Sequence, residues 1–270
     1  MSPDGSDVIL RAKHVGKAFG AGARLVQAVQ DVSLSVRRGE AVGIVGESGS
    51  GKSTLARLII GLEAPDAGEI EIHGVDVSAR GRRPRGVVRN VQMIFQDPFT
   101  SLNPRMKIGA AITEAPLAAK LITRQEREAA AREALEAVGL RPELARVRPH
   151  ALSGGQRQRV AIARALSLEP SVLIADEAVS ALDVSVQAQI LNLLQRLRGE
   201  RELTILFISH QLGAVAQLCH RVVVMCRGQI VEEGPVREIF AAPRHPYTRE
   251  LLAAQPGGGP KTLIPSTTAC

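Results

Sequence analysis

One stretch of eight residues has the composition of a loop that binds nucleotide phosphates. It lies between an apolar run at residues 41–45 and a helical pattern at residues 54–60, and it reads Gly46, Glu47, Ser48, Gly49, Ser50, Gly51, Lys52 and Ser53. The glycines let the backbone curl so that N–H groups point at phosphate oxygens, and the following helix adds its positive N-terminal end. Lys52 supplies a mobile charge for the outer phosphates, and the Ser53 hydroxyl can ligate magnesium. The alternative is an ordinary glycine-rich turn before a helix. The complete pattern, with the apolar run before it and the helical pattern after it, argues against that alternative, so we predict that the chain binds a nucleoside triphosphate.

Two adjacent carboxylates follow a second apolar run. Asp176 and Glu177 come directly after residues 172–175, and open α/β sheets bind ligands at the carboxyl ends of their strands. Asp176 is suited to hold magnesium beside Ser53, through water, and Glu177 to orient or deprotonate an attacking water. Taken alone, such a pair more often simply opens a loop. Its place downstream of a phosphate loop favours the catalytic interpretation.

A third stretch predicts a helix end with exposed backbone donors. Ser153 and Gln156 have the spacing of a capping box, and Gly154 and Gly155 stand between them. Two glycines in the first turn leave the backbone N–H groups uncovered, which makes a second helix end suited to an anion. These residues alone also fit a well-capped helix with a glycine-rich entry and nothing more.

Short strands and a helical insertion are predicted in the first 150 residues. The N-terminal patterns indicate an antiparallel sheet with one wet face, and the buried run at 91–95 indicates a further strand. The antiparallel strands are predicted at residues 8–12, 25–29, 32–36 and 69–74. Prolines 98, 104, 116, 142 and 149 then punctuate helical patterns. The clearest helix runs from about 124 to 138, with a capping box at Thr123 and Glu126 and a stop at Gly139.

Helices and apolar strands alternate after residue 150. Strands are predicted at 172–175, 204–208 and 222–225, and helices at 154–168, 184–198 and 212–218. Apolar strands separated by helices indicate a parallel sheet that is covered on both faces. Prolines and three consecutive glycines in the last thirty residues predict a loose tail.

The composition indicates a globular chain with an aliphatic core. It has 270 residues, of which 45% are hydrophobic, with no Trp, one Tyr and five Phe. Aromatic platforms for single-stranded nucleic acid are therefore scarce. The net charge of +7 would suit nucleic acid or an anionic membrane surface. Arginines cluster between residues 80 and 89, where glycine and proline interrupt them, so we expect a solvated loop there, with a contact patch as the alternative.

Neither cysteines nor apolar runs indicate a secreted or membrane-spanning chain. Cys219, Cys226 and Cys270 have no metal-ligand spacing, and their odd number argues against a disulfide framework, so we expect reduced cytoplasmic thiols. We expect no signal peptide, and no stretch approaches 18 consecutive apolar residues. A membrane-bound partner remains compatible with these features.

Five features together resemble the nucleotide-binding subunit of an ABC transporter. They are the loop at 46–53, Gln96 at a strand end, the Leu-Ser-Gly-Gly-Gln stretch at 152–156, the carboxylates with residues 180–183, and His210 after an apolar strand. They occur in the family's order and cover about residues 8–240. The resemblance implies ATP and Mg²⁺ as cofactors and a P-loop NTPase (RecA-like) α/β core. That core has a parallel sheet, an N-terminal antiparallel β subdomain and an inserted helical subdomain.

The resemblance also implies a role for each matching residue. Phe19 would stack on adenine, residues 46–53 and Thr54 would bind the phosphates, and Glu177 and His210 would be catalytic. Gln96 would join Ser53 and Asp176 at the metal and couple the γ-phosphate to the helical subdomain. Ser153, Gly154, Gly155 and Gln156 would close on ATP held by the opposite subunit, and Asp183 would help join the two. Taken singly, each of three residues also has a plain structural interpretation. Phe19 could be a core residue, His210 a hydrogen-bonded histidine at a strand end, and Gln96 a surface amide.

The implied domain layout is one ATPase domain over residues 1–255. Its core and β subdomain would occupy about 1–96 and 161–240, and the helical subdomain about 97–160. Residues 241–270 would form a C-terminal extension with a loose tail.

Three stretches, 96–105, 175–183 and 245–252, resemble ATPase subunits of bacterial dipeptide, oligopeptide and nickel importers. This branch implies solute import driven by ATP-dependent closure and opening of a dimer. It further implies a second, non-identical ATPase subunit, two integral membrane permease subunits and a solute-binding protein. The chain would then lie at the cytoplasmic face of the cell (inner) membrane, with no nucleic acid as partner.

Two other functions remain open at this point. The basic charge favours a soluble ABC ATPase that acts on DNA or the ribosome, although the chain has one phosphate loop and no coiled-coil heptads or zinc-ligand insertion. A subunit that energises an exporter would also look the same. Ala178, Val179, Ser209 and Gln211 depart from the commonest family pattern, but we expect none of them to touch the phosphates, so the resemblance still implies an ATPase.

Overall fold

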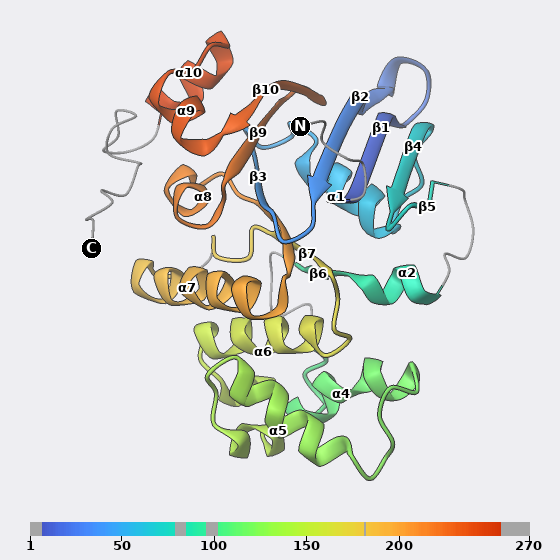
Figure 1. Cartoon of the computed structure of the whole chain (residues 1–270), viewed down its shortest axis with the longest axis vertical. Coiled ribbons are helices and arrows are strands. Elements are labelled where there is room, and N and C mark those ends of the chain that lie inside the picture. Colours follow the sequence, from blue (N-terminus) through green and yellow to red (C-terminus); the bar gives the residue numbers. More distant parts are fainter. Residues whose placement is uncertain (1–6, 79–84, 96–101, 181, 255–270) are drawn as a thin grey trace.

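A six-stranded sheet forms the centre of the computed structural model, which describes residues 7–78, 85–95, 102–180 and 182–254 (Figure 1). Its strand order is β10-β9-β3-β8-β7-β6, in which β10 is antiparallel to β9 and the other pairs are parallel. The strands are β3 (Ala41–Val45), β6 (Val91–Ile94), β7 (Val172–Asp176), β8 (Thr204–Ile208), β9 (Arg221–Cys226) and β10 (Gln229–Pro235). Every residue of β3, β7 and β8 is buried, which explains their unbroken apolar runs. The predicted parallel sheet is confirmed.

The N-terminal strands form a separate four-stranded sheet in the order β2-β1-β4-β5. They are β1 (Val8–Phe19), β2 (Val26–Arg37), β4 (Ala67–Ile72) and β5 (Val75–Asp76). The sequence predicted two strands where β2 is one. The interruption is a bulge, because Val15 pairs with Val32 while Lys17 pairs with Val29, and Asp31 between them has a φ of 52°. A bulge shifts the alternation of side chains without ending the strand.

The helices surround the central sheet, and α4 and α5 pack on α6 at the end away from the N-terminal sheet (Figure 1). They are α1 (Lys52–Ile60), α2 (Arg85–Asn90), α4 (Ile108–Ala118), α5 (Arg127–Ala137), α6 (Gly154–Leu166), α7 (Val184–Arg201), α8 (Leu212–Leu218), α9 (Val236–Ala241) and α10 (Pro246–Ala253). Short 3-10 turns lie at η2 (Gly22–Arg24), η3 (Pro142–Arg146) and η4 (Pro149–Ala151). Among the described residues, none of the helices combines the length and apolarity that a bilayer crossing requires.

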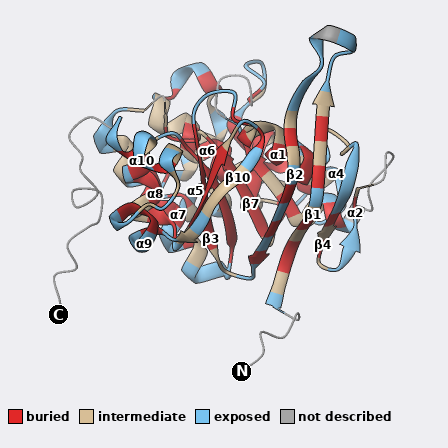
Figure 2. Ribbon diagram, turned by 90° about the horizontal axis from the view of Figure 1, so that it is seen from above, coloured by how far each residue is buried: buried red, intermediate tan, exposed pale blue. Residues whose placement is uncertain are grey.

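Side chains of the central strands alternate between two hydrophobic clusters. Ala41 and Val45 face the cluster that includes α6, α7 and α8, whereas Val42 and Ile44 face the cluster that includes α1 and the N-terminal sheet. Buried residues accordingly run along the central strands (Figure 2). Phe207 and Phe240 join leucines and isoleucines among the largest fully buried side chains, as an aliphatic core predicts.

The helical insertion contains one predicted helix and one that the prolines obscured. Thr123 and Glu126 exchange the expected hydrogen bonds, with Thr123 N donating to Glu126 Oε2 at 2.7 Å and Glu126 N donating to Thr123 Oγ1 at 3.3 Å. Gly139, with a φ of 70°, follows the end of α5. Pro116 was expected to separate helices but lies within α4, near its end and buried. Pro116 has no N–H to donate to Ile112 O, so α4 lacks one interior hydrogen bond, and the helix nevertheless continues because Ile112 and Pro116 are packed in the interior.

Two predicted loops are partly helical. Residues 85–90 form α2, and Arg89 is anchored rather than solvated, because its Nε donates to Leu168 O at 3.0 Å and its Nη2 donates to Glu169 at 3.1 Å. Residues 79–84 lie outside the described range.

The prediction of a loose tail over the last thirty residues is also wrong for residues 246–253, which form α10. The sequence signal was misleading because Pro246 begins this helix, at a position where its missing N–H has no intrahelical partner anyway. Residues 255–270 are not described.

An ion pair connects β9 to the start of the central sheet. The Arg221 guanidinium donates to both oxygens of Glu40, at 2.7 and 3.0 Å, and to Ser35 O at 2.6 Å, and it also contacts Glu233. Burial raises the pKa of Glu40, but hydrogen bonds and charge from Arg221 outweigh this, and the net pKa is lowered from 4.5. Glu40 therefore stabilises the fold above pH 4.5, and this contribution is lost as the pH falls below that value.

We expect Arg221→Met to lower the free energy of unfolding by roughly 1–3 kcal/mol, because Glu40 would remain largely buried without its partner. Urea unfolding at neutral pH measures this change. Arg146→Met is the matched control, since the pair of Arg146 and Glu128 is exposed and should contribute less than about 1 kcal/mol. Equal stability losses in the two variants would contradict the assignment.

Candidate nucleotide-binding site

The phosphate loop connects β3 to α1, and distant backbone segments enclose it. Gly46 and Gly51 have φ angles of 151° and 103°. A Cβ on Gly46 would lie 2.2 Å from Met225 O, and one on Gly51 would lie 2.2 Å from Ala28 O. No side chain fits at either position, so both glycines are required by the close approach as well as by the turn.

Lys52 lies at the start of α1 and is buried beneath the loop. Its Nζ donates to Gly46 O at 2.8 Å, to Glu47 O at 2.7 Å and to Ser50 Oγ at 3.2 Å. Burial lowers the pKa of the ammonium, while the charges of Glu177, Asp176 and Glu47 raise it, and the net pKa is lowered. The ammonium group of Lys52 therefore lies within the phosphate loop, where the sequence analysis expected it to bind phosphates.

Ser53 and Asp176 meet at the edge of the sheet. The Ser53 hydroxyl donates to Asp176 Oδ1 at 3.2 Å, although the two residues are 123 positions apart. Burial raises the pKa of Asp176, the bond from Ser53 opposes this, and the neighbouring Glu177 raises the pKa further. A hydroxyl and a carboxylate side by side are oxygen ligands of the kind that Mg²⁺ takes beside substrate phosphates. The donor set therefore fits the predicted metal.

Glu177 and His210 form the next pair along the same edge. His210 Nδ1 lies 3.2 Å from Glu177 Oε1. Glu177 has a φ of 48°, and its backbone N donates to Ile208 O at 2.9 Å. A left-handed conformation is unusual for glutamate and here turns the chain sharply as β7 ends. The structure thus brings together the two residues predicted to be catalytic.

The stretch 153–156 caps α6 as predicted. Gln156 N donates to Ser153 Oγ at 3.3 Å, and Ser153 N donates to Gln156 Oε1 at 3.0 Å. A Cβ on Gly155 would lie 2.6 Å from Val186 Cγ1, whereas one on Gly154 would meet nothing closer than Leu182 Cδ2 at 3.8 Å. These neighbours belong to α7 and the segment before it, and not to the phosphate loop of the same chain.

Asp183 has a structural role that the sequence analysis did not identify. It is the N-cap of α7, where its carboxylate accepts hydrogen bonds from Val186 N at 2.9 Å and from Ser185 Oγ at 2.7 Å. The bond from Val186 is the main reason that the pKa of Asp183 is lowered. An Asp three residues before a backbone donor at a helix start is a recognisable capping signal.

The remaining predicted residues are placed less directly. Phe19 ends β1 and is 40% exposed, with Lys17 Nζ 5.4 Å from its ring centroid, so it is not a core residue. Thr54 lies in the first turn of α1. Gln96 falls outside the described residues.

Two contacts at the site were not anticipated. Glu47 N donates to the hydroxyl of Tyr247 at 2.9 Å, and Gln187 Nε2 donates to Gln211 Oε1, next to His210. Tyr247 and Glu47 are 200 positions apart, so no local pattern in the sequence links them.

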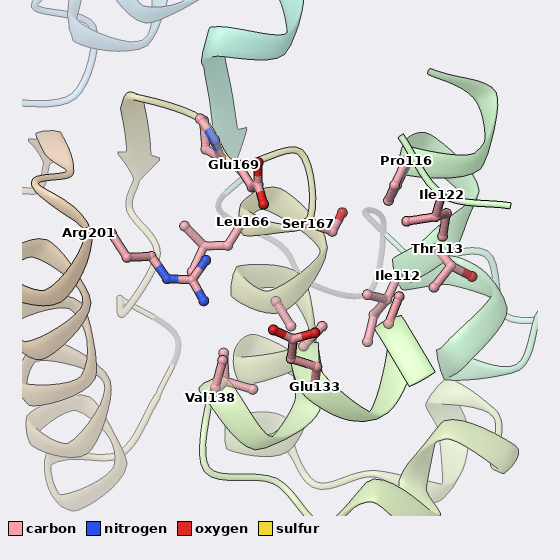
Figure 3. Close-up of a pocket in the computed structure, with 15 residues that line it drawn as sticks. Ile112, Thr113, Pro116, Ile122, Glu133, Val138, Leu166, Ser167, Glu169 and Arg201 are labelled. Atoms are coloured by element: carbon pink, nitrogen blue, oxygen red, sulfur yellow. The ribbon is translucent and has the colours of Figure 1, made fainter. Parts of the chain in front are cut away.

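A separate cavity of about 440 Å³ lies among α4, α5 and α6 (Figure 3). Its lining is mostly apolar, and Glu133 and Arg201 reach it from different helices. It includes none of the residues predicted for the nucleotide site.

The fold and the loop define a P-loop ATPase, and comparison with known proteins identifies its kind. Residues 29–180 match the family described as "ABC transporter", and residues 231–268 match "Oligopeptide/dipeptide transporter, C-terminal region". The chain therefore belongs to the ABC transporter family and is one of its ATPase cassettes, with the C-terminal region found in oligopeptide and dipeptide transporters.

Curated relatives align over most of the chain. A putative peptide import ATP-binding protein of Brucella abortus (strain 2308) is 46% identical over 275 residues, which cover 98% of this chain and 82% of that protein. A probable peptide ABC transporter ATP-binding protein of Sinorhizobium fredii is 48% identical over 259 residues, which cover 93% and 73%.

Solved structures of ATP-binding cassettes share the fold. A dimeric cassette in a post-hydrolysis state bound to ADP and Pi has a TM-score of 0.74 at 31% identity, covering 84% of this chain and 98% of that one. CbiO1 of Clostridium perfringens, part of the ABC transporter complex CbiONQ, has a TM-score of 0.76 at 29% identity, covering 87% and 92%. These likenesses confirm the predicted fold class.

We expect Gly155→Ala to lower the free energy of unfolding by roughly 1–3 kcal/mol, because its Cβ would overlap the stiff Val186 side chain. Gly154→Ala, one residue earlier in an open position, should stay within about 1 kcal/mol of the parent. Urea unfolding of the two variants measures the difference. Identical stabilities would show that α6 and α7 are not in the close contact described.

Proposed function

We propose that this chain is the ATP-hydrolysing subunit of a peptide importer and that it powers uptake by closing and opening a dimer. The observation that carries the proposal is the convergence of Ser53, Asp176, Glu177 and His210 at one edge of the sheet, beside the phosphate loop. The match of residues 231–268 and the names of the relatives support peptides as the solute rather than nickel.

Each residue of the convergence has a task in the proposed reaction. Lys52 and the loop N–H groups hold the phosphates, and Glu177 orients or deprotonates the attacking water. His210 contacts the γ-phosphate and, through its contact with Glu177, helps to keep that carboxylate in place. Phe19 stacks on adenine, Thr54 contributes to phosphate binding, and Gln96 couples the γ-phosphate to the helices. Ser53, Asp176 and Gln96 would hold Mg²⁺, which offsets negative charge on the phosphate oxygens when bound.

The second half of each ATP site would come from a companion ATPase subunit. The capped start of α6 presents uncovered N–H groups at Gly154 and Gly155, which suit the γ-phosphate of ATP held by the companion. Asp183, at the start of α7, would contribute to the same junction. ATP thus joins two subunits, and hydrolysis removes the bridging charge.

The proposed assembly places this chain on the cytoplasmic face of the cell (inner) membrane. The relatives are named as import ATP-binding proteins, which supports membrane permeases as partners. We further propose two permease subunits, a non-identical second ATPase and a solute-binding protein. We also propose the domain layout set out above, with the helical subdomain at about residues 97–160 as the part that responds to the γ-phosphate.

We expect Glu177→Gln to retain ATP binding while its hydrolysis rate falls by at least about 100-fold, because the water loses its base. Equilibrium binding of ATP and phosphate release under saturating ATP separate the two effects. Lys52→Ala is the contrasting variant and should lose ATP binding itself. Normal phosphate release from Glu177→Gln would refute the assignment of this residue.

We expect cells that lack this chain to lose uptake of labelled oligopeptides, and the parent gene but not Glu177→Gln to restore it. Uptake of radioactive Ni²⁺ is measured in the same cells as the comparison. If peptide uptake persists and nickel uptake is lost, the solute assignment is wrong while the ATPase assignment stands.

A further inference from the structure

The C-terminal region touches the phosphate loop at one defined point. The N–H of Glu47, the second residue of the loop, donates to the Tyr247 hydroxyl of α10 at 2.9 Å. This N–H therefore has a partner within the protein, and its hydrogen bond helps to determine where the first part of the loop lies.

The turn that carries Tyr247 is held firmly. Glu232 of β10 accepts hydrogen bonds from Arg244 N at 2.8 Å and from His245 N at 3.0 Å. His245 Nδ1 then accepts from Tyr247 N at 3.2 Å, which caps α10. A helix fixed by its backbone in this way can position a side chain more accurately than a free tail can.

The turn between β9 and β10, which precedes the C-terminal region, supports the loop at another point. Gly228, in the turn between β9 and β10, donates from its N to Ser50 O at 2.9 Å, and its carbonyl accepts from Gln30 N at 2.8 Å. Met225 O lies against Gly46 from the end of β9. Contacts from the β9–β10 turn and from α10 thus reach different parts of the loop.

We infer that Tyr247 is a positioning residue for nucleotide binding, through which the C-terminal region holds the phosphate loop in its binding conformation. The inference deepens the proposed function, because it rests on ATP binding by this loop. A loop that is already ordered loses less conformational entropy when the phosphates bind. Removal of the hydroxyl leaves the loop freer before ATP binds, so its effect should fall on affinity rather than on the chemical step.

The test compares two variants of α10 in the complete transporter. Tyr247→Phe removes the hydroxyl alone, and we expect KM for ATP to rise about three- to tenfold with kcat within about twofold. Arg249→Ala is the matched control: its Nε and Nη2 donate to Pro243 O and Arg244 O, so it weakens the same segment without touching the loop. It should lower Tm and leave KM unchanged.

Two outcomes would overturn the inference. One is an unchanged KM in Tyr247→Phe, and the other is an equal rise of KM in Arg249→Ala, which would assign the effect to the docking of α10 as a whole. Both are distinguishable from failure of the proposed function, because the parent protein and Glu177→Gln report on ATP hydrolysis independently.

The parent chain offers a second measurement if Tyr247→Phe folds poorly. Tyr247 is the one tyrosine of the sequence, which has no tryptophan, so tyrosine emission from the isolated subunit reports on this position alone. We expect that emission to stay constant while ATP binds, after correction for nucleotide absorption, because the hydroxyl already holds the loop in its binding conformation. A change in emission with the midpoint of ATP binding would show that the contact rearranges, and it would overturn the inference.

Discussion

The register of three parallel strands is the constraint on which the site depends. Ile208 of β8 pairs with Ile44 of β3 on one side and with Asp176 of β7 on the other. Because the side chains of these strands are buried on both faces, their register is fixed, and all three strands end at the same level. The phosphate loop, the paired carboxylates and His210 each follow one of these ends. A shift of one residue in β7 would also turn its buried side chains to the opposite face, so core packing and site geometry are determined together.

Opposite charges at this edge stabilise each other in a partly buried setting, whereas the adjacent carboxylates of Asp176 and Glu177 repel. Lys52 is surrounded by Asp176, Glu177 and Glu47, whose charges oppose the lowering of its pKa by burial. Burial raises the pKa of Asp176 and so favours its neutral form. Charged groups held in place by strand ends need little reorganisation when a charged ligand arrives, which is the condition under which electrostatic stabilisation is most effective. Ser53, hydrogen-bonded to Asp176, connects the loop to this arrangement.

Close approach of backbone segments explains which glycines the site requires. Gly46 and Gly51 are required because carbonyl oxygens of Met225 and Ala28 occupy the space of a side chain, and Gly155 because Val186 does. Gly49, in the same loop, meets nothing within 4 Å, and it is favoured there by its φ of 82° alone. Glycines that look equivalent in the motif thus have different physical reasons, and only the neighbours from distant parts of the chain distinguish them.

Local signals sufficed for the parallel strands of the central sheet, the phosphate loop and the capped start of α6, because period, turn chemistry and capping depend on residues a few positions apart. They did not predict β10, and they gave only parts of β1 and β2. Where these signals conflicted, as at Pro116, Asp31 and Pro246, the prediction ended or divided an element that packing holds together. Contacts between distant residues, such as Ser53 with Asp176 or Glu47 with Tyr247, have no local signal. The sequence by itself determined the family and predicted which residues would bind ATP and act on it. Only the tertiary structure decided which of them meet and that the C-terminal region supports the loop, because those distances are set by strand register and helix packing.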